Sequence, residues 1–134
     1  PFILTSSYPH EILHNWWGNS VYVDYATGNW AEGLTAYLAD HLMKEGEGQG
    51  DIYRRDVLKK YRDFVSDQKD FPLTEFRSRN SAASEAVGYG KTLMGFHGLR
   101  QRLGDDLFRQ GLRTFYREYR GQRASFANVQ SVFE

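Results

Sequence analysis

The sequence predicts a single, mainly α-helical domain over residues 1–134, with about six helices and at most one short extended segment. Apolar residues recur at helical spacing along most of the chain, and helix start and stop signals bound these segments. Only residues 20–25 show the alternation that is typical of a strand. Because 40% of the residues are hydrophobic and 16% aromatic, we expect a folded protein with a core rather than a disordered one.

The first helix is predicted to begin at Ser6 and Ser7, whose hydroxyl groups suit helix capping. Pro9 then falls in the first turn, where its missing N–H costs nothing. Gly18 and Asn19 provide the stop signal. The helix is therefore expected to continue past the histidine pair that it carries.

A second helix is predicted over residues 29–44. One face carries an apolar stripe, and the other carries small residues beside Glu32, which would let another helix approach closely. The remaining predicted helices are 51–68, 81–103, 105–119 and 126–133, the last capped by Ser125, with a loop at 70–80.

Charge and residue usage exclude several classes of function. The 17 basic and 17 acidic residues cancel, so we expect no nucleic-acid partner. No apolar run reaches the roughly 18 residues that a membrane-spanning helix needs. Cysteine is absent, so a bound metal would be held by histidine and carboxylate groups. The same absence leaves the cellular compartment open.

The segment HEILH, residues 10–14, carries the chemistry. Four residues rotate about 400° around a helix, so the imidazoles of His10 and His14 project from one face, one turn apart. Zinc suits such a clamp and leaves a position for water. Glu11 lies next to the first histidine and could take a proton from that water. The alternative is an ordinary amphipathic helix with two unrelated histidines.

The stretches HEILHNWWGN and NWAEGLTAYLADHL, and GYGK at residues 88–91, resemble the alanyl aminopeptidase family of gluzincin zinc metallopeptidases, which are relatives of leukotriene hydrolase. The resemblance implies the helical portion of a thermolysin-like catalytic domain. It implies one Zn²⁺ per chain, held by His10, His14 and Glu32. It also implies that the Tyr89 hydroxyl stabilises the tetrahedral intermediate of peptide hydrolysis.

The sequence departs from the family pattern in the spacing of the third ligand. Residues Asn15 to Ala31 separate the second histidine from Glu32, which is one residue fewer than the family usually has. Asp24 and Asp40 are therefore alternative ligands. Neither is followed by the glycine that follows the family's glutamate, so Glu32 is the expected ligand.

The function implied by the resemblance is zinc-dependent hydrolysis of peptides, from the amino terminus. The family's Gly-x-Met-x-Glu-Asn segment and its amino-terminal β domain are absent from this sequence, so we expect a fragment of a larger catalytic domain. Two alternatives stay open: a fragment that binds zinc without turnover, and a non-enzymatic helical interaction module. A face exposed by truncation would favour self-association.

Other residues have simpler interpretations. His41 and His97 lie on apolar stripes and are expected to be packed histidines. Arg54 is expected on a solvated helix face. Gly88 and Gly90 flank Tyr89 within a predicted helix, which indicates either access for a substrate or close packing against another helix.

Overall fold

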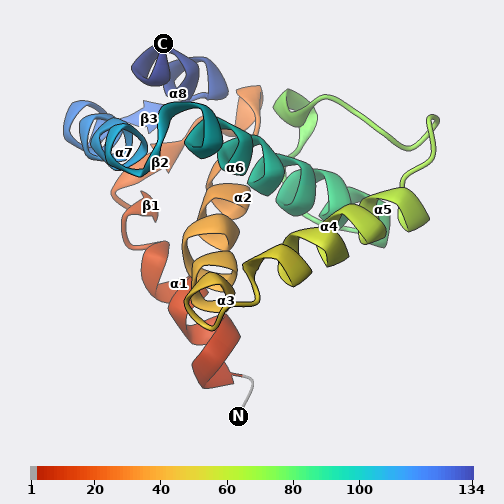
Figure 1. The fold of residues 1–134 in the computed structure, drawn as a ribbon. Coiled ribbons are helices and arrows are strands. Elements are labelled where there is room, and N and C mark those ends of the chain that lie inside the picture. The colour runs from red at the N-terminus through yellow and green to blue at the C-terminus, as the bar shows by residue number, and fades with distance from the viewer. Residues whose placement is uncertain (1–2) are drawn as a thin grey trace.

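The computed structural model describes residues 3–134 and confirms a mainly helical fold (Figure 1). Within this range the helices join into six continuous runs, as predicted. Three of the runs contain a wider, π-helical turn (η1, η3 and η5). The runs are η1 (Ile3–Ser7) with α1 (Tyr8–Leu13); α2 (Ala31–Ala36), η3 (Tyr37–His41) and α3 (Leu42–Gly46); α4 (Gly50–Phe64); α5 (Ala82–Glu85), η5 (Ala86–Lys91) and α6 (Thr92–Leu103); α7 (Asp105–Tyr119); and α8 (Phe126–Phe133). Short 3₁₀ turns lie at η2 (Tyr25–Thr27) and η4 (Leu73–Glu75).

The extended structure differs from the prediction of at most one segment. Three short strands, β1 (Trp17–Gly18), β2 (Val21–Val23) and β3 (Arg123–Ala124), form a parallel sheet in the order β1-β2-β3. Strands of two residues are too short to produce a periodic pattern. The third strand pairs with β2 only because the C-terminal helices bring it back across the fold, which sequence spacing alone does not reveal.

The first helix also begins and ends earlier than predicted. Ser7 has helical backbone angles (φ −60°, ψ −42°) and makes no capping hydrogen bond, because the wide turn η1 precedes it. At the other end, the chain leaves the helix after His14. The Asn15 side chain donates to the Ile12 carbonyl, and the chain continues into β1.

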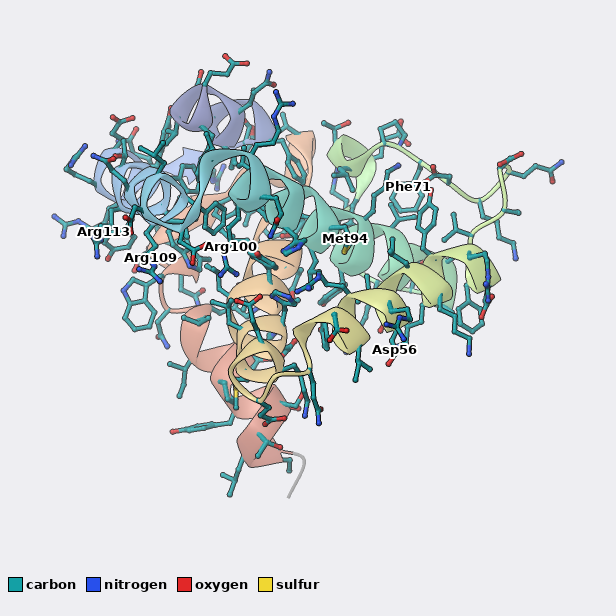
Figure 2. The ribbon with its side chains drawn as sticks, viewed as in Figure 1. Asp56, Phe71, Met94, Arg100, Arg109 and Arg113 are labelled. Atoms are coloured by element: carbon teal, nitrogen blue, oxygen red, sulfur yellow. The ribbon has the colours of Figure 1, made fainter. Side chains whose placement is uncertain are left out.

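Helix α4 buries only part of its apolar residues. Ile52 and Leu58, two apolar residues of this helix, are about half exposed, whereas Val57 and Tyr61 are partly buried. Arg54 instead faces inward and donates to His41 Nε2 at 2.7 Å, while Asp56 points away from the fold (Figure 2). The prediction of a solvated position for Arg54 is therefore wrong, because the buried His41 ring provides a partner on the inner side.

An aromatic cluster forms the core around the sheet. Trp17 stacks on Phe115 of α7 with ring centroids 5.8 Å apart, and Trp30 meets the same ring edge-on at 5.1 Å. The indole of Trp30 also donates to the Ala124 carbonyl at 2.7 Å. These contacts fix the start of α2 against the sheet and α7.

Two glycines allow the helices around the site to approach closely. Helix α6 crosses α2 in Figure 1, and a Cβ on Gly33 would overlap the side chain of Thr92. A Cβ on Gly88 would overlap the Phe76 ring. Phe76 lies in the loop after η4, so Gly88 makes room for a loop side chain rather than for another helix. Over residues 3–134, none of the helices combines the length and apolar character needed to cross a bilayer.

Candidate metal centre

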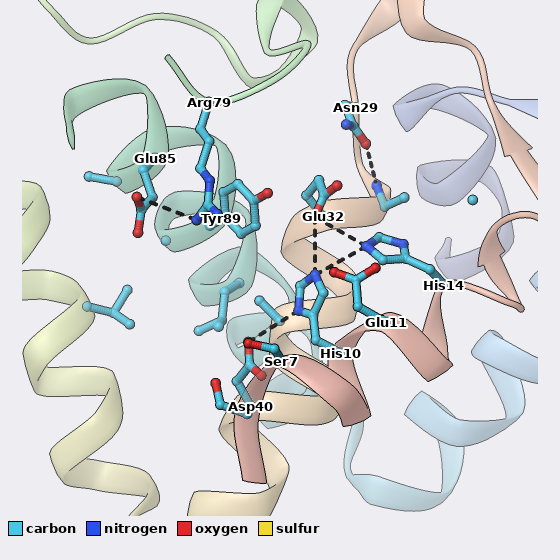
Figure 3. A pocket seen from close by; sticks show the side chains of 18 of the residues that line it. Ser7, His10, Glu11, His14, Asn29, Glu32, Asp40, Arg79, Glu85 and Tyr89 are labelled. Atoms are coloured by element: carbon cyan, nitrogen blue, oxygen red, sulfur yellow. Dashed lines mark hydrogen bonds and ion pairs between the residues drawn. The ribbon is translucent and has the colours of Figure 1, made fainter. Parts of the chain in front are cut away.

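Three side chains from two helices converge at one point (Figure 3). The Nε2 atoms of His10, on α1, and of His14, which caps the C-terminal end of α1, lie 3.1 Å apart. The Oε2 atom of Glu32, on α2, lies 3.2 Å from the first and 3.3 Å from the second. The three residues are the group among the described residues that could hold a metal ion. The structure thus brings together the two histidines and the glutamate that the sequence singled out.

The remaining nitrogen of each imidazole has its own partner. Nδ1 of His10 lies 3.3 Å from Asp40 Oδ2, and Nδ1 of His14 lies 2.8 Å from the Trp17 carbonyl oxygen. A carboxylate and a carbonyl only accept hydrogen bonds, so each Nδ1 carries the proton and donates it. In each neutral ring the Nε2 lone pair is left free and points at the convergence point.

This arrangement requires a positive charge at its centre. Burial disfavours the charged form of His10, but hydrogen bonds to Asp40 and Glu32 outweigh burial and raise its pKa from 6.5 to about 9. Hydrogen bonding to Glu32 also raises the pKa of His14. Burial opposes ionisation of Glu32, yet the hydrogen bonds from both histidines hold its pKa well below the usual range. Without a metal ion, an additional proton on His10 reduces the repulsion between the two Nε2 lone pairs and the Glu32 carboxylate.

The spacing of the donor atoms fits zinc. At Zn–N distances of about 2.0–2.1 Å, two ligands of a tetrahedral ion lie about 3.3–3.4 Å apart. The three observed separations are 3.1 to 3.3 Å. Two neutral imidazoles and one carboxylate are also a donor set of catalytic zinc sites, in which a fourth position is left open.

The donor atoms of His10, His14 and Glu32 form a metal-binding triangle inside a cleft. Both expected catalytic side chains, Glu11 and Tyr89, line this cleft. Glu11 is exposed and lies beside His10 and His14 in Figure 3. Tyr89, on η5, approaches from the opposite wall, and its ring stacks near His10 with centroids 6.3 Å apart. Burial and then the Glu32 charge raise the Tyr89 pKa above its ordinary value, so the phenol stays a hydrogen-bond donor at neutral pH.

The cleft has a volume of about 740 Å³, within the range of small-molecule and peptide sites. Helix α4 forms the wall across from the triangle, and Arg79 lies at the rim with its guanidinium 5.4 Å from the centre of the Tyr89 ring. Arg79 also pairs with Glu85 at 3.7 Å. The site therefore combines a metal-binding triangle with an open polar cleft.

The other residues that the sequence singled out have different placements. Asp24 does not belong to the triangle, and Asp40 contacts the outer nitrogen of His10. His41 is fully buried and stacks on Tyr37, whose hydroxyl lies 3.0 Å from His97 Nδ1. The two histidines are therefore packed, as predicted. The contact of Asp40 with His10 was missed, because it depends on the wide turn η3.

The comparison with protein families decides what this site belongs to. The family model for the peptidase family M1 domain matches residues 5–134. The chain belongs to peptidase family M1. The match confirms the resemblance at the level of the family, and the matched range includes His10, Glu11, His14, Glu32 and Tyr89. Membership of this family supports peptidase function in general. No curated protein and no solved structure matches the chain significantly.

Proposed function

We propose that this chain carries the zinc centre and catalytic residues of an M1 metallopeptidase that removes residues from the amino terminus of peptides. The observation that carries the proposal is the triangle of His10, His14 and Glu32, with its donor atoms 3.1 to 3.3 Å apart. The family assignment supports peptide hydrolysis, and the resemblance to alanyl aminopeptidases supports action at the amino terminus.

In this proposal His10, His14 and Glu32 hold one Zn²⁺. When bound, zinc supplies a Lewis acid that lowers the pKa of water and polarises a carbonyl group. Glu11 accepts the proton of the attacking water and returns it to the leaving amine. Its carboxylate is exposed in the cleft, where a water and a peptide can reach it.

Tyr89 donates a hydrogen bond to the oxygen that becomes negative as water attacks the peptide carbonyl. Its position across the triangle from Glu11 supports this division of roles, because the scissile bond would lie between the two side chains (Figure 3). The raised pKa of Tyr89 supports it as well, since only the protonated phenol can donate.

The test is peptide hydrolysis by the zinc-supplemented protein beside its Glu11→Gln variant. Gln has nearly the shape of Glu but cannot accept the proton, so the variant should bind zinc normally and lose about 10²–10⁴-fold in turnover. A matched peptide with an acetylated amino terminus tests action from that end. Retained turnover in the variant would contradict the role of Glu11. Zinc binding without hydrolysis by the unaltered chain would contradict the activity and favour the zinc-binding alternative.

A further inference from the structure

The two histidines of the triangle are supported by different groups on their outer sides. His14 donates to a backbone carbonyl, that of Trp17, at 2.8 Å. His10 faces a side-chain carboxylate, Asp40 Oδ2, at 3.3 Å. A backbone carbonyl is present whatever the side chain, whereas the support of His10 depends on one residue that lies 30 positions away in sequence.

The wide turn η3 explains how Asp40 reaches His10. Asp40 follows Glu32 by eight residues. In a regular α-helix eight residues rotate by about 800° around the helix axis, so the two side chains would point about 80° apart. The π-helical turn Tyr37–His41 absorbs one extra residue within that interval. Asp40 therefore points about where the seventh residue after Glu32 would point in a regular α-helix. That direction is about 20° from the direction of Glu32, so both carboxylates face α1.

The position of the Asp40 carboxylate costs folding free energy. Its side chain is 22% exposed, and its Oδ1 atom is buried without a hydrogen-bond partner among the described residues. Leaving a buried acceptor unpaired costs about 1–3 kcal/mol. The hydrogen-bond partner of the carboxylate is the His10 ring, which indicates that an acidic group at this position acts on His10.

We propose that Asp40 is a positioning residue for the metal centre, which orients His10 and makes its Nε2 a stronger donor. The proposal rests on the zinc site proposed above. The Asp40 carboxylate holds the Nδ1 proton of His10, and this fixes the tautomer that leaves the Nε2 lone pair toward Glu32 and His14. Its negative charge also increases the basicity of the ring.

The test measures the zinc dissociation constant by competition with a chromogenic chelator. Asp40→Ala removes both the hydrogen bond and the charge, and should weaken zinc binding about 10–100-fold. Asp40→Asn keeps an oxygen that can accept the Nδ1 proton but loses the charge, so its loss should be smaller. Asp24→Asn is the matched control, since it removes one carboxylate outside the triangle, and it should leave the constant unchanged.

Helix content and melting temperature of the zinc-free variants separate positioning from folding. Because Asn is nearly isosteric with Asp, Asp40→Asn keeps the test valid if Asp40→Ala does not fold. Folded Asp40 variants that bind zinc as tightly as Asp24→Asn would overturn the proposal while the zinc site stands. Absence of zinc binding by the unaltered chain would instead overturn the proposed site itself, and the role of Asp40 with it.

Discussion

The Nε2 atoms of His10 and His14 lie 3.1 Å apart, although the Nδ1 atom of each ring already donates its proton to another group. Two imidazole lone pairs that face one another at this distance, beside the Glu32 carboxylate, repel unless a cation or a proton lies between them. A metal ion satisfies all three donor atoms at once, and a proton on His10 serves in its absence.

The first prediction concerns stability and pH. In the zinc-free protein the pKa of His10 is raised from 6.5 to about 9, so its stabilising effect is complete below pH 6.5 and is lost as pH rises through about 9. The melting temperature measured in the presence of a chelator should therefore fall across this interval. His10→Gln should remove most of that fall. A melting temperature of the zinc-free protein that stays constant over the interval would contradict the account.

The second prediction separates the role of Tyr89 from metal binding. Tyr89→Phe removes the hydroxyl and keeps the ring that packs near Phe76. Turnover of the peptide should fall about 10²–10³-fold, as for the loss of one donor to an oxyanion. Zinc content, measured by elemental analysis, should not change. A large loss of zinc in this variant would refute the separation of the two roles.

The third prediction concerns the close approach of η5 to the loop that carries Phe76. A Cβ at position 88 would overlap the Phe76 ring, so Gly88→Ala should destabilise the protein by about 1–3 kcal/mol in urea unfolding. Gly95→Ala is the matched control. No atom lies within 4 Å of a Cβ at that position in α6, and the change should stabilise the helix by about 0.5–1 kcal/mol. Equal effects of the two substitutions would contradict the packing described.

Much of the fold and of the site could be predicted from the sequence because local patterns determine it. The spacing of His10 and His14 places both rings on one helix face, and helical periodicity identified all six helical runs. Glu32 was expected as a ligand despite the shortened connection before it. The structure places its carboxylate oxygen 3.2 Å and 3.3 Å from the two imidazole nitrogens.

The remainder depends on contacts between distant residues. Arg54 turns inward because His41 and Glu45 accept from it, and nothing in the pattern of α4 reveals these partners. The outer support of His10 by Asp40 depends on a π-helical turn, which has no clear sequence signature. Self-association stays a prediction; Tyr25 and Phe64 are exposed apolar residues that also line the cleft.

The zinc content of the purified chain, compared with that of His14→Ala, tests the central claim most directly. The account predicts about one zinc per chain in the unaltered protein and loss of the metal in the variant, because the remaining two donors cannot complete the site. Glu32→Ala should behave like His14→Ala, whereas Asp24→Ala should retain the metal. Absence of zinc from the unaltered chain, or equal zinc in the unaltered protein and His14→Ala, would contradict the proposed centre.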